Sequence, residues 1–503
     1  MNGNAKELKK SNFGDFQTPV DLARRICSLL VDLGIESASV LEPTCGQGSF
    51  IVAALEVLSS VQQVVGIDIN PGHLDDASRA VTKSPGDPRI ELRHDDIFRI
   101  DWSAVVEDIA KPVLVLGNLP WVTNASLGQS GSRNLPQKTN FQGHAGLDAI
   151  TGKSNFDISE WMAIRLVEVL RDVDSTIAIL LKTAVARKVL RHAWKLNIPV
   201  GEARIYGINA AKNFDAAVEA CLFVCRTNTP GECQCWEFDS LDSAQASSSF
   251  GFADGRVIAD LGTYQRLHHL VSHRKQGWRS GIKHDCSKVM ELRLDDDGQM
   301  QNGLGEAVDI EEHVAFPMLK SSEVANPKKR QARRYMLVTQ SSVGQDTSHL
   351  ENSAPKAWAY LNKHAARLGN RKSSIYRKRP QFSIFGIGDY SFTPWKVAIS
   401  GFYKSLKFRV IAPRAGRPVV LDDTVYFYPC HSKKEAELIQ RLLHSDAASA
   451  FLNSLIFWDA KRPVTIEVLE LLSLEALAKE HGCLDEFTLH SCRNQDDQRE
   501  LSL

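Results

Sequence analysis

The chain has 503 residues, 43% of them hydrophobic, and its 60 basic side chains balance its 60 acidic ones. This length and composition are typical of a soluble globular protein with two or three domains. No apolar run is long enough to span a bilayer, and the polar residues 1–11 lack the apolar core of a secretory signal. We therefore expect a cytoplasmic protein with no membrane partner.

Ten cysteines in a chain without a secretion signal predict reduced thiols rather than a disulfide framework. The tightest group consists of Cys221, Cys225, Cys233 and Cys235. It can be interpreted as a zinc site, but its spacing is not that of a zinc ribbon or finger. Because Cys221 and Cys225 also lie inside an apolar run typical of a strand, we expect buried thiols and no metal site.

The first half of the chain alternates short apolar runs with segments of helical periodicity. Strands are expected at 39–42, 64–68, 90–94, 113–117, 176–181 and 217–224, and helices at 49–58, 74–81, 156–170 and 185–196. This alternation predicts an α/β fold with a doubly wound, largely parallel, Rossmann-like sheet over residues 1–226. Residues 128–152 break the rhythm, and we expect either a long loop over the active site or a plain surface insertion.

The character of the sequence changes after residue 226, where 227–231 is expected to be a linker. Short β-like runs at 335–339, 382–385 and 397–400 predict a second, mixed α+β domain over 227–480. A closing helix is expected at 464–479, followed by a polar tail over 481–503.

A glycine-rich turn at 42–50 follows the first predicted strand and opens a helix. Gly46 and Gly48 allow a tight turn and a close approach of the backbone to a ligand, next to the free amides of a helix N-terminus. Asp68 ends the next strand, 20 residues after Gly48, where a carboxylate can accept hydrogen bonds from both ribose hydroxyls of an adenosine. Ile51 stands where a dinucleotide fingerprint has its third glycine, which favours an adenosyl ligand over NAD. The alternative is an ordinary β–α turn.

Two adjacent carboxylates, Asp95 and Asp96, end the third predicted strand. A carboxylate at that edge can accept a hydrogen bond from the amino group of an adenine, and the alternative is a solvated turn residue. We favour Asp96, because Ile97 and Phe98 follow it as apolar walls for the ring.

Asn118, Leu119, Pro120 and Trp121 follow the fourth predicted strand, and their chemistry suits methylation of an exocyclic amine. The lone pair of such an amine is conjugated with its ring, so one acceptor on each N–H makes it a better nucleophile. The Asn118 side chain and the main-chain carbonyl of Leu119 can be those acceptors. Pro120 stiffens the turn, and Trp121 can stack on a base held out of its helix. The alternative is a plain turn with a proline stop.

Three segments in this order, at 16–19, 43–48 and 118–121, resemble the gamma class of amino-methyltransferases, which methylate adenine N6 in DNA. The resemblance implies S-adenosylmethionine as the cofactor, bound by the loop that starts at Glu42 and Pro43. It also implies that a segment made of Gln17, Thr18 and Pro19 packs over the methionine end of the cofactor.

The resemblance extends further along the chain. Phe214, within 213–218, matches the aromatic residue that sandwiches the flipped base, and the alternative is a core aromatic. Segments at 280–283, 385–390 and 396–401 resemble the target-recognition region of TaqI-like and Eco57I-like adenine methylases. Leu119 departs from the proline that is usual in the family. The backbone carbonyl is kept but rigidity is lost, so weak activity or an inactive pseudo-enzyme stays open.

Residues 320–417 carry 20 basic and 4 acidic side chains, a net charge of +16 that indicates a polyanionic partner. The alternative for each basic run is a solvated loop. We expect double-stranded DNA as the partner. The candidate phosphate contacts are Lys328, Lys329, Arg330, Arg333, Arg334, Arg371, Lys372, Arg377, Lys378 and Arg379.

The family implies a prokaryotic modification enzyme of a restriction-modification or related defence system. The sequence has no nuclease cluster of the Asp…Glu-x-Lys type, so a separate restriction endonuclease is favoured over a fused one. The alternatives are a cytosine-N4, RNA or protein-glutamine methyltransferase, and a DNA-binding specificity protein with a dead catalytic fold. The glutamine enzymes end soon after the fold, whereas more than half of this chain follows the last predicted strand.

Overall fold

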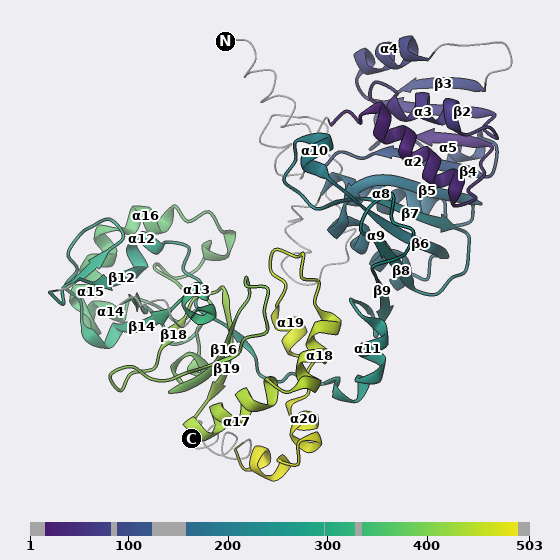
Figure 1. The fold of residues 1–503 in the computed structure, drawn as a ribbon. Helices are drawn as coiled ribbons and strands as arrows, with labels where there is room; N and C mark the ends of the chain where they lie inside the picture. Colours follow the sequence, from purple (N-terminus) through teal and green to yellow (C-terminus); the bar gives the residue numbers. More distant parts are fainter. Residues whose placement is uncertain (1–15, 82–87, 123–156, 296, 327–333, 491–503) are drawn as a thin grey trace. The chain divides into compact units, whose positions relative to one another are not determined.

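The computed structural model describes residues 16–81, 88–122, 157–295, 297–326 and 334–490, which fold into two units that divide between Leu261 and Gly262 (Figure 1). The predicted loop at 128–152 lies outside the described residues. None of the described helices is long and apolar enough to cross a membrane.

One ten-stranded sheet, with the order β10-β9-β8-β6-β7-β5-β4-β1-β2-β3, organises the first unit. Neighbouring strands from β3 to β5 are parallel, and β7 is antiparallel to both β5 and β6. The prediction of a doubly wound, largely parallel sheet is confirmed. The strands are β1 (Ser39–Glu42), β2 (Gln63–Asp68), β3 (Arg89–His94), β4 (Val113–Asn118), β5 (Ser175–Lys182), β6 (Val200–Ile208), β7 (Ala220–Thr227), β8 (Gln234–Phe238), β9 (Ser248–Ala253) and β10 (Arg256–Ile258).

Strand β6 was not predicted from the sequence. Its apolar alternation is broken by a bulge between Gly201 and Arg204, where Glu202 has a φ of 51°. The strands β8, β9 and β10 then continue the same sheet. The first unit therefore extends past the predicted boundary at residue 226, and the segment expected as a linker is the turn between β7 and β8.

Helices cover both faces of this sheet (Figure 1). One core joins α2, α3 and α4 to one set of alternating strand residues, which includes Leu114 and Leu116. Because successive strand residues point to opposite faces, the buried Val113 and Val115 belong to the other face. The helices are α2 (Val20–Asp32), α3 (Ser49–Val57), α4 (Pro71–Ala80), α5 (Trp102–Glu107), α8 (Ile158–Val169), α9 (Thr183–Lys195) and α10 (Ala210–Phe214).

The second unit contains two smaller sheets, with the orders β11-β19-β16-β17 and β13-β12-β15-β14-β18. This mixed architecture agrees with the predicted α+β domain. The strands are β11 (Arg279–Ser280), β12 (Glu291–Leu294), β13 (Met300–Asn302), β14 (Ala315–Leu319), β15 (Arg334–Leu337), β16 (Trp395–Ser400), β17 (Arg409–Ile411), β18 (Val420–Leu421) and β19 (Val425–Cys430).

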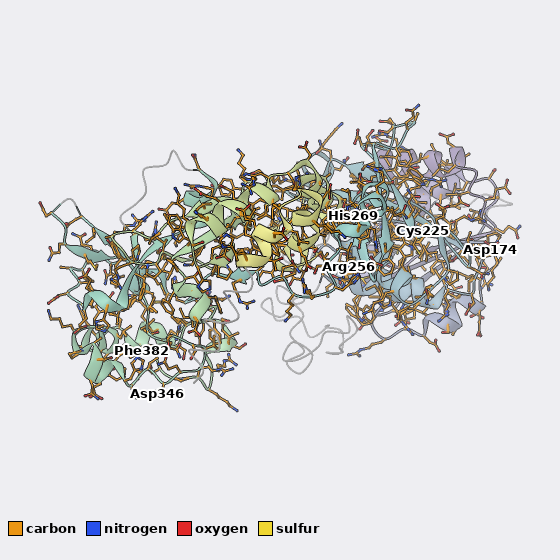
Figure 2. The ribbon with its side chains drawn as sticks, turned by 90° about the horizontal axis from the view of Figure 1, so that it is seen from below. Asp174, Cys225, Arg256, His269, Asp346 and Phe382 are labelled. Atoms are coloured by element: carbon orange, nitrogen blue, oxygen red, sulfur yellow. The ribbon has the colours of Figure 1, made fainter. Side chains whose placement is uncertain are left out.

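Short helices surround these sheets. The larger core of the second unit includes Phe382, which is labelled in Figure 2. The Phe382 ring lies 5.4 Å from the Trp358 ring, measured between centroids. The helices are α11 (Leu261–Arg266), α12 (Ser287–Met290), α13 (Ser321–Ala325), α14 (Leu350–Ser353), α15 (Pro355–Lys363), α16 (Ala365–Gly369), α17 (Lys433–Leu443), α18 (Asp446–Leu455), α19 (Ile466–Leu469) and α20 (Leu474–Glu480).

Two predictions for the second unit were wrong. The run at 382–385 is not a strand, although Phe385 forms an isolated bridge with Lys283. The single helix expected at 464–479 is two helices, α19 and α20. Between them the backbone of Leu472 pairs with Val271, which interrupts the helical hydrogen bonds. Within the predicted tail, residues 484–490 are helical.

Candidate active site

Three predicted site residues are the last residues of parallel strands in the centre of the first sheet. Glu42 ends β1, Asp68 ends β2 and Asn118 ends β4. Since β1 pairs in parallel with both β2 and β4, their carboxyl ends lie at one edge of the sheet. Ligands of open α/β sheets bind outside this edge, so the fold brings the two halves of the predicted site together.

The glycine loop after β1 is tight and touches the segment that precedes α2. Gly46 and Gly48 have φ values of +50° and +82°, which favour glycine. A Cβ atom on Gly46 would lie 2.5 Å from Gln17 Oε1, and that oxygen accepts a hydrogen bond from the Gln47 amide at 3.0 Å. Gln17 therefore lies directly on the loop, next to the buried Thr18 and to Pro19, which precedes the first residue of α2.

Asp68 holds the glycine loop to the start of α4. One carboxylate oxygen accepts from the Gly46 amide at 2.9 Å, and the other accepts from the Asn70 amide at 2.8 Å. His73 Nδ1 lies 3.4 Å from the second oxygen. A carboxylate has about four lone-pair positions, so Asp68 keeps acceptor capacity for ribose hydroxyls.

An apolar surface accompanies Asp68 at this edge. Ile69 is 51% exposed, which is unusual for isoleucine directly after a buried strand. Phe98 packs on Trp161, with ring centroids 5.1 Å apart. No role was predicted for Ile69 from the sequence, although its position directly after Asp68 was the available signal.

Asp95 and Asp96 both form local turn contacts. The exposed Asp95 accepts from the Asp96 amide at 2.7 Å, and Asp96 accepts from the Phe98 amide at 3.0 Å. Asp96 is the more buried of the two, and its second oxygen lies 3.4 Å from Arg99 Nε. A turn residue and a ligand acceptor are both compatible with this geometry.

Glu42 is a buried carboxyl group with an open position. Burial and the nearby charge of Asp68 raise its pKa well above the ordinary value, while a hydrogen bond from the Ile51 amide acts in the opposite direction. Its Oε2 atom is buried and forms no hydrogen bond with the described residues. Such a group fits a cationic or hydrogen-bond-donating ligand, because an unmatched buried carboxylate is unstable by itself.

The Asn118 amide is held with one end occupied and the other free. Its Nδ2 donates to the Phe16 carbonyl at 3.0 Å, whereas its Oδ1 is buried and forms no hydrogen bond with the described residues. Thr44 Oγ1, in the glycine loop, donates to the main-chain carbonyl of Asn118 at 3.1 Å. The donated hydrogen bond orients the amide, which leaves an acceptor atom beside the glycine loop.

Leu119 forms a backbone hydrogen bond that a proline at this position could not form. Its amide donates to the Leu180 carbonyl of β5 at 3.3 Å, and its side chain is buried. A proline has no N–H to donate. The departure from the family pattern therefore replaces ring rigidity with a backbone hydrogen bond to the next strand.

Three aromatic rings from distant parts of the chain meet beside Asn118. Trp121 lies 4.9 Å from Phe214 and 5.6 Å from Phe16, measured between ring centroids. Trp121 and Phe214 are 6% and 7% exposed, so the rings fill the space between them in this structure. Trp121 and Phe214 were each predicted to contact a flipped base, whereas no role was predicted for Phe16, the first residue of the segment at 16–19.

Lys182, the last residue of β5, fixes the far end of the turn and was also missed. Its ammonium group donates to the Trp121 carbonyl at 3.0 Å and pairs with Asp157, the residue before α8. The Ile158 amide donates to the Val122 carbonyl at 2.9 Å. The turn is thus tied to both β5 and α8. A lysine that ends a run of buried strand residues was the available signal.

The cysteines of the suspected cluster do not form a metal site in the part of the chain that the structure describes. Cys221 and Cys225 lie buried in β7, Cys235 lies buried in β8, and Cys233 is exposed, contrary to the expectation of buried thiols. Burial raises the pKa of the Cys221 thiol to about 12.

The basic candidates divide into three groups. Lys328, Lys329, Arg330 and Arg333 lie outside the described residues. The side chains of Arg334 and Arg371 form contacts within the second unit. Arg334 pairs with Glu291 at 2.8 Å, and Arg371 donates to the Ser383 carbonyl at 2.7 Å and lies over the Tyr376 ring. The exposed members are Lys372, Arg377, Lys378 and Arg379.

The strand order, the antiparallel β7 and the glycine loop at the carboxyl edge are those of the Rossmann-like fold of S-adenosylmethionine-dependent methyltransferases. The Type II methyltransferase M.NspV from Nostoc sp. (strain ATCC 29411 / PCC 7524) is 45% identical over 477 residues, which cover 94% of this chain and 98% of that protein. The chain therefore belongs to the Type II methyltransferases.

Among solved structures, the Type IIL restriction-modification enzyme MmeI in complex with DNA has a similar fold. Its TM-score is 0.54 at 14% sequence identity, and the match covers 94% of this chain and 67% of that one. No protein-family model matches the sequence.

Proposed function

We propose that the chain is a gamma-class, site-specific DNA methyltransferase that acts on the N6 amino group of adenine in double-stranded DNA. In this proposal it is the modification enzyme of a restriction-modification system and works beside a separate restriction endonuclease. The observation that carries the proposal is Asn118 Oδ1, which is buried beside the glycine loop and forms no hydrogen bond with the residues that the structure describes.

The cofactor is S-adenosylmethionine, which supplies an electrophilic methyl group on a sulfonium sulfur. Asp68 would accept hydrogen bonds from the ribose hydroxyls and Asp96 one from the adenine amino group, with Ile69 and Phe98 beside the ring. The open Oε2 of Glu42 suits the amino group of the methionine end. The segment of Gln17, Thr18 and Pro19, which already touches the glycine loop, would cover that end.

Asn118 and Leu119 would activate the substrate amine. The Asn118 Oδ1 accepts one N–H of the adenine amino group, and the main-chain carbonyl of Leu119 accepts the other. These two acceptors localise the nitrogen lone pair, which attacks the methyl carbon. The N–C bond forms as the S–C bond breaks, and the nitrogen then loses a proton to solvent. The chain needs no strong general base, because the proton leaves a nitrogen that is already positively charged.

Trp121, Phe214 and Phe16 are suited to hold a flipped base. A base beside Asn118 would stack on Trp121 and contact Phe214, which requires the two rings to separate from their present 4.9 Å contact. Pro120 lies between Leu119 and Trp121 and limits the freedom of the turn.

The second unit is proposed to recognise the DNA target. The exposed Lys372, Arg377, Lys378 and Arg379 can neutralise backbone phosphates, which supplies affinity that is independent of sequence. Arg334 and Arg371 would instead support the surface from inside the unit.

Sequencing of modified bases tests this function. DNA from cells that express the chain should carry N6-methyladenine at one sequence motif, and DNA from cells that express Asn118→Ala should carry none. Methylated cytosine at a motif would assign the chain to cytosine-N4 chemistry, since the same two acceptors fit that amine. Unmethylated DNA from both strains, with cofactor binding intact, would identify a DNA-binding protein without activity.

A further inference from the structure

An exposed pair of aromatic side chains lies in the loop between β16 and β17 of the second unit. Phe402 and Tyr403 are 38% and 41% exposed. The loop is fixed at both ends, because the Gly401 amide donates to the Thr424 carbonyl at 3.0 Å and the Phe408 amide donates to His444 Nε2 at 3.2 Å. The exposed aromatic pair therefore directly follows one fixed end of the loop.

The start of this loop is pressed against its surroundings. A Cβ atom on Gly401 would lie 2.8 Å from the Tyr426 ring and 3.4 Å from the Val464 carbonyl oxygen. The segment 457–463, which leads to Val464, therefore lies beside the loop. Its Arg462 places the guanidinium carbon 4.7 Å from the centroid of the Phe402 ring.

The Tyr403 side chain forms no hydrogen bond and no ring contact with the residues that the structure describes. An exposed aromatic side chain buries a large area at low conformational cost when it meets a partner. Phe402 is partly covered by Arg462, so Tyr403 is the ring that is available to a partner.

The charge around Tyr403 indicates which partner this is. Lys404, Lys407, Lys461 and Arg462 are exposed, and Asp459 is the acidic residue in the segments 401–407 and 457–463. Basic side chains around an apolar ring match a duplex, where phosphates flank stacked bases. A symmetric contact with a second copy of the chain offers no such match, because the cations of the two copies would face each other.

We infer that Tyr403 inserts between base pairs of the DNA duplex and kinks it, while the four surrounding basic side chains contact phosphates. Apolar wedges of this kind unstack a base step and bend DNA. The inference rests on the proposed function for the identity of the substrate, and it adds a specific contact that the catalytic reaction does not require.

The test uses the full chain and a duplex with the methylated motif, labelled at its two ends with a donor and an acceptor fluorophore. Tyr403→Ala should weaken binding about tenfold or more, as loss of an aromatic–base stack does, and should abolish the bend seen by energy transfer. Tyr403→Phe keeps the ring and should keep both properties. Trp236→Ala, a matched control 47% exposed on β8, should behave as wild type.

Wild-type affinity and bending in Tyr403→Ala would overturn the inference, and so would an equal loss in Trp236→Ala. A change only in self-association, measured by sedimentation, would identify a protein interface instead and would also overturn it. If the wild-type chain methylates DNA but Tyr403→Ala binds and bends the duplex as the wild type does, the inference about Tyr403 fails while the proposed function stands. A wild-type chain that neither methylates nor binds the duplex removes the proposed function together with the wedge.

Discussion

At the scale of single residues, the candidate site combines two buried oxygens that have no hydrogen-bond partner in the described part of the chain. Asn118 Oδ1 and Glu42 Oε2 both lie at the carboxyl edge of the first sheet. Buried polar atoms without hydrogen bonds are unfavourable in a folded protein, so such atoms at one edge indicate a position kept for a ligand. Phe16 and Thr44 orient the Asn118 peptide and amide without occupying its acceptor.

Glu42→Gln should separate stability from cofactor affinity. The pKa of Glu42 is raised in the folded state, so the folded chain binds a proton that the unfolded chain releases. The stability from this proton is present below the ordinary pKa and is lost as the pH rises. The variant should therefore lose less stability between pH 5 and pH 8 in urea unfolding of the cofactor-free chain. It should also bind S-adenosylmethionine at least about tenfold more weakly in calorimetry, because a charged partner is lost.

The exposed Glu56, which pairs with Arg24, supplies the control, because Glu56→Gln leaves the cofactor edge intact. If Glu42→Gln showed wild-type affinity, the carboxyl group would not be a cofactor contact.

At the scale of elements, the turn after β4 is held by its neighbours more than by its own sequence. Leu119 donates to β5, and Lys182 at the end of β5 holds the Trp121 carbonyl while it pairs with Asp157 before α8. These contacts place the turn by hydrogen bonds from two other elements. They explain how the turn keeps its shape without the proline that is usual at position 119.

Lys182→Met should lower kcat by about tenfold to a hundredfold, because a small displacement of a positioned group has effects of that order. The affinity for S-adenosylmethionine should change little, since Lys182 contacts the turn and not the glycine loop. Lys182→Arg should restore part of kcat. Lys188, which pairs with Glu160 between α9 and α8, provides the matched control Lys188→Met. Steady-state kinetics in which both methionine variants lose the same activity would show a general effect of helix packing.

Strand β16 contains a buried lysine that should make the stability of the second unit depend on pH. Burial lowers the pKa of Lys396 to about 7, and its ammonium group donates to the Thr393 carbonyl at 2.7 Å. The unfolded chain keeps the proton up to about pH 10.4, so unfolding takes up a proton above about pH 7. Stability should therefore rise with pH in this window, by up to about 1.4 kcal/mol per unit.

Lys396→Met should remove this slope and raise the unfolding free energy most near pH 6, in urea titrations followed from pH 6 to pH 9. The exposed Lys433, which pairs with Glu437, gives the control Lys433→Met. A slope that persists in Lys396→Met would assign the pH dependence to another group.

At the scale of the whole molecule, balanced overall charge conceals a basic segment at 320–417 with a net charge of +16. This segment lies entirely in the second unit. The candidate active site and the basic segment thus lie in different units. This division suits a protein that acts at a specific target on a polyanionic substrate.

The double variant Arg377→Gln/Lys378→Gln should weaken DNA binding and make it less sensitive to salt. Each phosphate contact removed lowers the slope of log affinity against log salt by about 0.9, so the expected change is about 2. Titrations at several salt concentrations measure it. Lys433→Gln, outside the basic segment, should leave the slope as it is. An unchanged slope in the double variant would assign the salt dependence to other side chains.

Local sequence patterns predicted the parallel core of the first unit well. Strands β1, β2 and β4 are largely apolar runs that end at polar residues of the candidate site, so their order and their chemistry could both be predicted from the sequence. Strand β6 was missed because the bulge at Glu202 breaks its alternation. The strands β8 to β10 were assigned to the wrong domain, because their membership in the sheet depends on pairing between distant segments.

The same limit applies to the site. Asn118, Asp68 and the glycines could be assigned from local motifs. Phe16 and Thr44 also lie within the motifs at 16–19 and 43–48, but their contacts, like those of Lys182, join residues far apart in the chain and were not predicted. The sequence also did not predict which basic side chains are exposed. Arg334 and Arg371 look like Lys372 and Arg377 in the sequence, yet only the fold directs the first two into internal contacts.

Nucleoside mass spectrometry tests the central claim most directly. Purified chain is incubated with unmodified genomic DNA and S-adenosylmethionine that carries a deuterated methyl group, and the DNA is digested to nucleosides. The account predicts labelled N6-methyladenine with the wild-type chain and none with Asn118→Ala, which should still bind the cofactor. Label on cytosine or on protein, or equal labelling of adenine by the variant, would contradict it.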